Sequence, residues 1–247
     1  MNNLIRAEWF RLRHSGNSVL MIAVFGLIAA VLQFAGDEGV RISAETFFLH
    51  ASMGMLITIL VATGYVTSVF NSKLANYEIM KGTPPLQTIL SKTLVVLISA
   101  TVTYFLPSMI LLAVFDSAHM NLSMMLLCYV CLAKMAVTAV AVCIICKNGA
   151  ATVLYAMAFI FQTTPLVLIA NFTGLNVTPL TSFMTSTQLM IIGNIGVMDL
   201  EELSMPLDTS YAAAKIIISF IIISAVMTAL AHRSLKYKWQ SDLLTPQ

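Results

Sequence analysis

The sequence predicts an all-α polytopic membrane protein with six transmembrane helices, an N-terminal interfacial helix and a re-entrant outer segment between helices five and six. Of its 247 residues, 59% are hydrophobic and 10% are charged, whereas soluble domains have about 45–50% apolar and about 25% charged residues. The apolar residues gather in segments of spanning length, and the basic residues gather in alternate connections. These observations exclude a soluble enzyme and a disordered or fibrous chain.

Six segments are long and apolar enough to cross a bilayer, whose hydrocarbon core of about 30 Å needs about 20 helical residues. The first segment follows a mostly polar stretch and lacks a clear cleavage site, so we expect it to remain as an anchor rather than to be removed as a signal peptide. The six predicted spans are 19–35, 47–70, 93–115, 122–146, 150–170 and 211–231.

The basic residues predict the direction of the spans, because they favour the cytoplasmic side of a membrane. Only Arg41 and Lys215 fall on the predicted outer side. We therefore expect a multi-pass protein of the cell membrane with both termini in the cytoplasm. The basic residues on the predicted inner side are Arg6, Arg11, Arg13, Lys73, Lys81, Lys92, Lys147, Arg233, Lys236 and Lys238.

The connections between the spans predict a single transmembrane domain over 1–247, because none is long enough for a second domain. The outer segment 171–210 has an apolar centre that is short and interrupted by Gly193 and Gly196. This pattern predicts a re-entrant or interfacial helix pair. The chain has no Gly-x-x-x-x-Gly-Lys-Ser/Thr phosphate loop, so we expect no ATPase site of its own and no enzymatic activity.

Residues 1–18 predict a short interfacial helix on the inner leaflet. At about 100° per residue, Trp9 and Leu12 share an apolar face, and Arg6 and Arg13 lie beside it. Such a helix places its tryptophan at the level of the lipid headgroups. The alternative is a plain positively charged segment that sets the topology.

The loop 71–92 on the cytoplasmic side carries the most informative pattern. A helical piece containing Glu78 is followed by the break Gly-Thr-Pro-Pro at 82–85, and a second helical start then leads through Lys92 into the third span. The glycine can end the first helix and the prolines can open the next. By itself, the pattern also fits a simple turn between spans.

This loop resembles the coupling element of the permease subunits of type-two ABC transporters. That family has an N-terminal interfacial helix, six spans, both termini inside and a re-entrant outer segment between spans five and six. Glu78, Gly82, Thr83 and Lys92 match the loop motif by position, whereas Gln87 stands where many relatives have a basic residue. The resemblance implies the membrane-spanning subunit of an ATP-driven ABC exporter, whose loop 71–92 couples to a separate ATPase subunit.

The resemblance also implies the partners of the chain. The partner ATPase subunit would bind ATP and Mg, and this chain would bind no cofactor. A second permease copy or a paralogue would complete the path through the lipid bilayer, and no nucleic acid is expected at a net charge of +2. Small permeases of this family, including those of the lantibiotic immunity type, often export a peptide or a hydrophobic antimicrobial. This is the substrate class that we expect.

Lys134 lies in the middle of the fourth predicted span, about 18 Å from the nearest interface and too deep for its side chain to reach the headgroups. A charge at this depth costs a few kcal/mol or more. No acidic residue lies in the predicted spans, so the ammonium must face a wet cavity, contact backbone carbonyls, meet a partner subunit or be neutral. We expect Lys134 to line the substrate path or the subunit interface; a satisfied structural lysine is the alternative.

The four cysteines form two Cys-x-x-Cys pairs, Cys128 with Cys131 and Cys143 with Cys146. All four fall on one predicted helix over about 27 Å, whereas zinc needs its ligands about 2.3 Å from one ion. The spacing therefore predicts helix packing and no metal site. Two other function classes remain as alternatives: an integral-membrane thiol oxidoreductase that uses these pairs, and a membrane sensor that transports nothing.

Two prolines lie inside predicted spans, Pro107 in the third and Pro165 in the fifth. A proline removes a backbone donor and clashes with the preceding turn of a helix. We expect a kink or local unwinding at both positions, tolerated where neighbouring groups satisfy the freed carbonyls.

Overall fold

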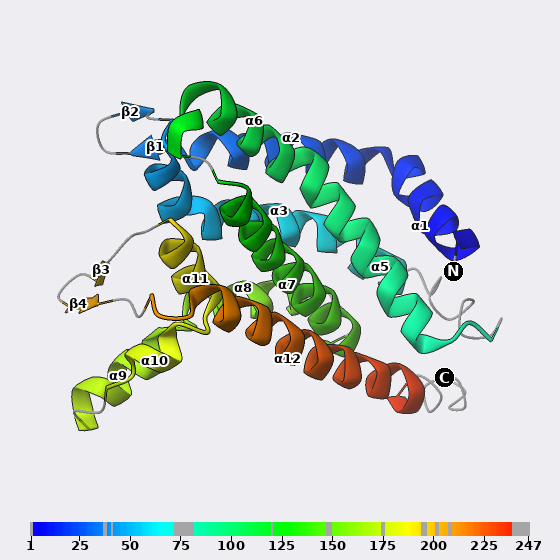
Figure 1. Ribbon diagram of the computed structural model, residues 1–247. Helices are drawn as coiled ribbons and strands as arrows, with labels where there is room; N and C mark the ends of the chain where they lie inside the picture. Colours follow the sequence, from blue (N-terminus) through cyan, green and yellow to red (C-terminus); the bar gives the residue numbers. More distant parts are fainter. Residues whose placement is uncertain are drawn as a thin grey trace.

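The computed structural model describes residues 2–36, 39–40, 42–71, 82–119, 121–146, 150–173, 176–193, 197–200, 203–206 and 209–238. These residues form a helical bundle with two short antiparallel hairpins at one end (Figure 1). The α-helices are α1 (Asn2–His14), α2 (Gly16–Leu32), α3 (Ala44–Asn71), α5 (Pro85–Ala100), α6 (Leu106–Phe115), α7 (Leu122–Cys146), α8 (Ala150–Ile160), α9 (Thr164–Thr173), α10 (Thr178–Thr181), α11 (Thr185–Ile192) and α12 (Ala212–Arg233). The other elements are the π-helices η1 (Thr101–Phe105) and η3 (Ser234–Lys238), the 3₁₀-helix η2 (Ser117–His119), and the strands β1 (Ala35–Gly36), β2 (Gly39–Val40), β3 (Val197–Leu200) and β4 (Leu203–Pro206).

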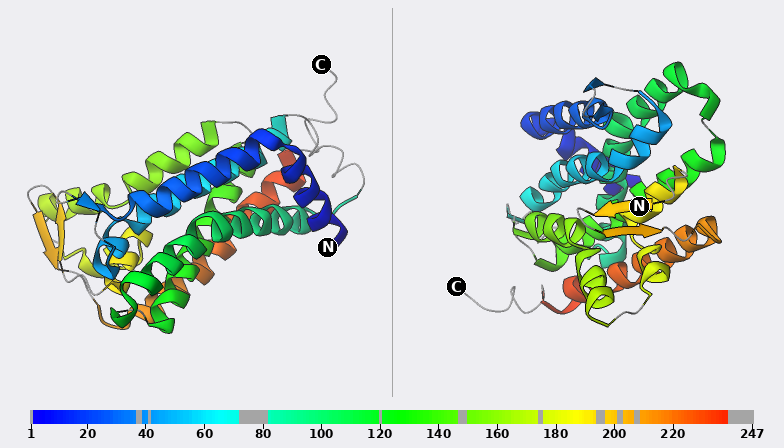
Figure 2. Two further views of the ribbon diagram at one scale, coloured as in Figure 1. Left: turned by 90° about the horizontal axis from the view of Figure 1, so that it is seen from above. Right: turned by 90° about the vertical axis from the view of Figure 1, so that its left-hand side faces the viewer.

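Four helices of the described chain are long and apolar enough to cross a membrane: Ala44–Val69, Pro85–Phe115, Leu122–Cys146 and Ala212–Lys236. A fifth is reached if α1 and α2, which meet at 85°, are taken together as one bent span. The left-hand view of Figure 2 shows α1 turning sharply away from α2 at the N-terminal end of the bundle. These helices make the chain a membrane protein.

The predicted fifth span is interrupted in the structure. Helix α8 has 11 residues, which at 1.5 Å per residue cover about 16 Å, roughly half of a hydrocarbon core. The chain then leaves the helix until α9 begins at Thr164. The physical reason is local: Pro165 has no N–H to donate to the carbonyl of Phe161, four residues earlier, and its ring clashes with that carbonyl. The side chain of Gln162 holds the break in place by donating to Ser186 Oγ at 2.8 Å.

The third span accommodates Pro107 through the π-helical turn η1, which joins α5 to α6 without ending the helix. This turn brings the fully buried Tyr104 toward α2 and α3, where its hydroxyl donates to Gln33 Oε1 at 2.5 Å. Gln33 Nε2 in turn donates to Ser108 Oγ at 2.6 Å. A buried polar network whose members are satisfied in this way fixes one arrangement of the helices it joins.

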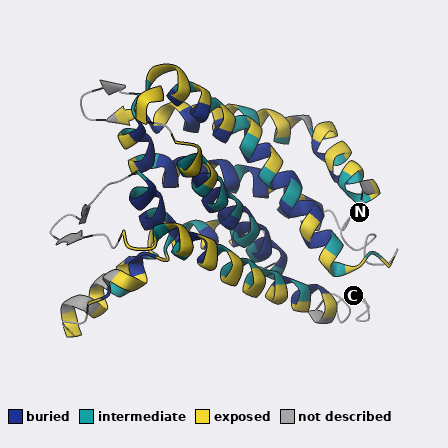
Figure 3. Cartoon of the chain, in the orientation of Figure 1, coloured by how far each residue is buried: buried dark blue, intermediate teal, exposed yellow. Residues whose placement is uncertain are grey.

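The core lies between α3, α5 and α7, with α7 in the middle of the bundle. On α3 the fully buried side chains recur every three or four residues, which gives this helix one inward face. The apolar ones, each at most 1% exposed, are Phe47, Ala51, Met55, Ile59, Ala62 and Val66. Figure 3 shows the buried residues on the inner faces of the helices and the exposed ones on the outer faces.

The outer faces of the bundle are aliphatic. Helix α12 exposes large apolar side chains along most of its length, and α2 does the same. A soluble monomer rarely exposes a contiguous apolar patch of more than a few hundred Å², whereas lipid is a good solvent for such a face. The exposed residues on α12 are Ile217, Ile218, Ile221, Ile222, Val226 and Leu230.

The two ends of the bundle differ in charge. Helix α1, the start of α5 and the end of α12 lie at one end (Figure 1), which we call the basic end. It contains the described residues Arg6, Arg11, Arg13, Lys92, Arg233 and Lys236. The opposite end contains both hairpins, the end of α6 and the start of α12.

Candidate functional site

A buried carboxylate joins three helices at the basic end. Glu8 lies on α1, is 0% exposed, and receives Lys92 Nζ of α5 on its Oε1 at 2.6 Å. The hydroxyl of Tyr65 on α3 donates to the other carboxylate oxygen at 2.6 Å. Arg11 Nη1, one turn further along α1, lies 3.1 Å from Oε1. We call Glu8, Arg11, Tyr65 and Lys92 the Glu8 cluster.

The Glu8 cluster fixes how α1 sits on the bundle. A carboxylate and an ammonium removed from water are stable only when each has good partners, and breaking such a pair costs about 3–5 kcal/mol. Both oxygens of Glu8 are occupied, and Lys92 is also 0% exposed. Helix α1 is therefore held to α3 and α5 by a charged contact in addition to its apolar face.

The four predicted site residues of the coupling loop differ in their surroundings. Glu78 lies outside the described residues. Gly82 is exposed and has φ of +75°, a left-handed conformation that favours glycine, and the partly exposed Thr83 follows it. Pro84 then caps α5 and Pro85 is its first residue. Lys92, two turns further on, points into the Glu8 cluster and has no exposed surface.

The predicted interfacial residues lie on the outward side of α1. Arg6, Trp9 and Arg13 are exposed, with 44% of Trp9 accessible. The 85° angle between α1 and α2 lets α1 lie across the bundle while α2 runs along it. This is the arrangement expected of a helix at the surface of a bilayer.

Lys134 is buried at the middle of α7 and does not point to the outer face of the bundle. Its side chain is surrounded by neutral oxygens: Nζ donates to Gln188 Oε1 at 2.5 Å and to Ser219 Oγ at 3.3 Å. The carbonyl oxygen of Phe183 lies 3.5 Å from the same nitrogen. Gln188 Nε2 also donates to Ser219 Oγ, at 2.9 Å. We call Lys134, Gln188 and Ser219 the Lys134 cluster.

The Lys134 cluster connects α11 to the long helices α7 and α12. Gln188 lies on α11, which follows the break in the fifth predicted span, and Ser219 lies on α12. The amide of Gln188 suits this position because it accepts through oxygen and donates through nitrogen. These contacts are of the kind that the structural interpretation of Lys134 expects; its place on a substrate path or subunit interface stays a prediction.

The cysteines all lie on α7, as predicted, with Cys128, Cys131 and Cys143 buried and Cys146 partly buried. In the described part of the chain, no group of three His, Cys, Asp or Glu residues could hold a metal ion. The sulfur of Cys131 lies 3.9 Å from Gln188 Oε1, beside the Lys134 cluster. Buried thiols on one helix contribute small side chains for close helix packing.

At the opposite end, Asp116 ties the end of α6 to the start of α3. Its Oδ2 accepts the backbone N–H of Ala44, the first residue of α3, at 2.7 Å. Its Oδ1 accepts from His119 Nδ1 at 2.6 Å. The hydrogen bond from His119, followed by that from Ala44, lowers the pKa of Asp116 below its ordinary 3.8. The hydrogen bond to Asp116 and its negative charge raise the pKa of His119 above 6.5.

Three of these functional contacts were not predicted from the sequence. Glu8 was not among the predicted site residues, although an acidic residue within a basic amphipathic helix is a signal for a buried partner. Gln188 carried no comparable signal, and neither did the contact of Asp116 with Ala44, because these partners are distant in the sequence. Comparisons with protein-family models, curated proteins and solved structures find no match to this chain.

Proposed function

We propose that this chain is the membrane-spanning subunit of an ATP-driven ABC exporter of the type-two class. In this proposal α2, the four long helices and the broken α8–α9 segment form six spans. The segment 171–210 forms the re-entrant outer element, and both termini lie in the cytoplasm. A separate ATPase subunit binds ATP and Mg, and a second permease chain completes the path.

The Glu8 cluster is the observation that carries this proposal. Helices α3 and α5 flank the loop 71–92, and Tyr65 and Lys92 fasten both of them to α1 through one carboxylate. A displacement of the loop by a partner subunit would move α1, α3 and α5 together instead of being absorbed in a flexible turn. A membrane subunit that receives mechanical work from an ATPase needs such a connection at its cytoplasmic end.

The proposed substrate class comes from the resemblance to small permeases of this family, and the setting of the chain is consistent with it. The described helices present apolar faces to the membrane, and the described chain has no large soluble region in which a polar substrate could be collected. We propose a peptide or hydrophobic antimicrobial, taken from the membrane or its surface. The proposed movement starts at the basic end, where an ATPase would bind, and reaches the outer segment through α7 and α12.

Copurification with ATPase activity tests this proposal. The full chain, tagged at one terminus, is purified in mild detergent from its own host and, separately, from a host in which it is expressed alone. We expect the first preparation to contain a polypeptide with a phosphate loop and to show vanadate-sensitive ATP hydrolysis. We expect no hydrolysis in the second. ATP hydrolysis by the chain alone, or a first preparation without a phosphate-loop subunit, contradicts the proposal.

A further inference from the structure

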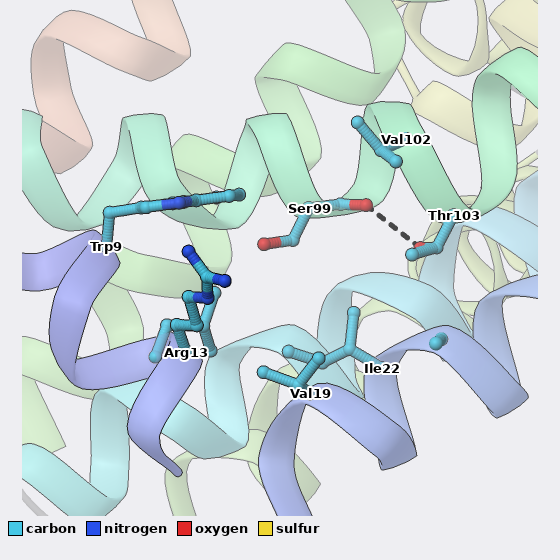
Figure 4. A pocket seen from close by; sticks show the side chains of 9 residues that line it. Trp9, Arg13, Val19, Ile22, Ser99, Val102 and Thr103 are labelled. Atoms are coloured by element: carbon cyan, nitrogen blue, oxygen red, sulfur yellow. Dashed lines mark hydrogen bonds between the residues drawn. The ribbon is translucent and has the colours of Figure 1, made fainter. Parts of the chain in front are cut away.

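A cavity of about 420 Å³ lies in the angle between α1, α2 and the third span (Figure 4). Its size falls within the range of small-molecule sites, about 300–1,000 Å³. Trp9 and Arg13 of α1 form its mouth, and Val102 and Thr103 of η1 form its far wall. The remaining lining residues are Leu12, Val19, Ile22, Ala23 and Ser99.

The walls of this cavity are apolar even where they carry hydroxyl groups. Ser99 Oγ donates to the carbonyl of Val95 at 2.8 Å, and Thr103 Oγ1 donates to the carbonyl of Ser99 at 2.9 Å (Figure 4). Both hydroxyl hydrogens are therefore used within the helix. At the far end, a Cβ on Gly26 would lie 2.4 Å from Thr103 Oγ1, so α2 closes directly onto η1 there.

A second cavity of about 490 Å³ shares Trp9 and Arg13 with the first and is also lined by Arg6, Phe10 and Val95. The two cavities thus adjoin at Trp9 and Arg13, and both are lined by residues of the third span. We call the two cavities together the groove. Its lining residues from Val95 to Thr103 cover about 12 Å of the third span. One end lies at α1, the predicted interfacial helix, and the other lies at Val102 and Thr103, near the middle of the third span.

The arginines at the mouth are free to bind an anion. Arg11, on the other side of α1, is paired with Glu8. Among the described residues, by contrast, neither Arg6 nor Arg13 has a hydrogen-bond or ion-pair partner. Figure 4 shows the guanidinium of Arg13 beside Trp9 and directed into the cavity. Guanidinium groups bind phosphate oxygens in a bidentate fork.

We propose that this groove binds an anionic glycerophospholipid of the leaflet that contains α1, with an acyl chain in the apolar cavity and the phosphate on Arg13 and Arg6. The arginines and the apolar walls are arranged as a phospholipid requires. The positive charge lies where the phosphate would be, at the membrane surface, and the apolar cavity lies where the acyl chain would be, toward the centre of the membrane. An uncharged hydrophobic substrate would leave both arginines without a counter-charge. A helix of a partner protein would pair with them only if it carried an acidic residue at the same depth. The bound lipid would fill the angle between α1 and α2 and hold α1 against the bundle, independently of any ATPase.

Quenching of Trp9 fluorescence by brominated lipids tests this proposal. The chain has two tryptophans, so Trp239→Phe leaves Trp9 as the only one. The full-length variant is reconstituted in vesicles of unlabelled phosphatidylcholine. One series contains a low fraction of brominated phosphatidylglycerol and the other a low fraction of brominated phosphatidylcholine, each brominated on its acyl chains near the glycerol. In high salt, which screens diffuse attraction, we expect half-maximal quenching at a mole fraction about tenfold lower for phosphatidylglycerol, the factor expected of one direct hydrogen bond to a charged group.

Two further substitutions in the same background separate the site from general charge and from general apolarity. Arg13→Gln removes the preference for phosphatidylglycerol, whereas Arg233→Gln, which removes the same charge at the same end of the bundle, retains it. Ala23→Phe fills the cavity without changing the charge and weakens quenching by phosphatidylglycerol. Equal quenching by the two lipids, equal effects of the two arginine substitutions, or unchanged quenching after Ala23→Phe would each overturn the proposal.

Discussion

Glu8 is a carboxylate without exposed surface on a helix whose other charges are basic, and its two oxygens are both used. Glu8→Gln keeps the shape of the side chain but leaves the ammonium of Lys92 buried without its counter-charge. We expect a loss of about 3–5 kcal/mol in the free energy of unfolding in detergent. Adding Lys92→Met to this variant should recover part of the loss, since the buried ammonium is then removed.

The control for this double-mutant cycle is Glu45→Gln, at an exposed acid on the first turn of α3. A substitution of this kind changes stability by about 0.5 kcal/mol or less. If Glu8→Gln behaves like Glu45→Gln, or if the two changes at Glu8 and Lys92 are additive, the Glu8 cluster does not fasten α1 to the bundle.

Lys134 presents the opposite case, a buried cation among neutral oxygens. Lys134→Met keeps the length of the side chain and removes a charge that is costly at this depth. The relief of that cost offsets the lost hydrogen bonds to Gln188 and Ser219, so we expect stability within about 2 kcal/mol of the parent. Export by this variant, measured at equal membrane level, then reports on the role: it falls if Lys134 serves transport. A variant that fails to assemble contradicts the expected balance.

The pair of Asp116 and His119 gives the opposite end of the bundle a dependence on pH. Because the pKa of His119 is raised above 6.5, its contribution to stability is complete below that pH and is lost as pH rises through the folded-state pKa. NMR titration of the His119 ring should give a pKa above 6.5, and Asp116→Asn should return it toward that value. A titration that is unchanged by Asp116→Asn would show that the two side chains do not interact in the folded protein.

At the scale of the element, the sequence predicted the long helices well and the fifth span poorly. Hydropathy averages over a window, so it identified α3, α7 and α12 but passed over the polar residues and Pro165 that separate α8 from α9. The kink or local unwinding expected at Pro107 and Pro165 was predicted correctly from the chemistry of proline. At Pro107, η1 absorbs the disturbance within a continuous helix, because Tyr104 and Ser108 gain partners on α2.

Helix α11 is held by the side chain of Gln188, which contacts α7 and α12 at the same time. Gln188→Leu leaves Lys134 without its shortest contact and removes the anchor of the outer segment. At about 1–3 kcal/mol for the lost contacts, amide hydrogen exchange in α11 should become about 5- to 150-fold faster. Gln87→Leu, on the partly exposed face of α5, is the control and should not alter exchange there. Unchanged exchange in α11 would mean that apolar packing alone holds this helix.

At the scale of the whole molecule, composition sufficed to predict a helical membrane protein, because it depends on totals and not on contacts. The site was less predictable. Lys134 was recognised from its depth alone, yet its partner Gln188 lies 54 residues away on α11. The pair of Glu8 and Lys92 spans 84 residues, and a charged side chain is expected at the surface until its partner is known. The information missing at the sequence level was which distant residues contact one another, and not which residue types are present.

The central claim is that an ATPase subunit binds the basic end of the bundle beside the loop 71–92. Its most direct test is a photo-crosslinking amino acid placed at Thr83, with the same residue at the exposed Ser117 on the opposite end as control. Irradiated in native membranes, the Thr83 variant should capture a polypeptide that contains a phosphate loop, and the Ser117 variant should not. Capture of that polypeptide from Ser117, or capture from Thr83 of proteins that all lack a phosphate loop, would contradict the proposed function.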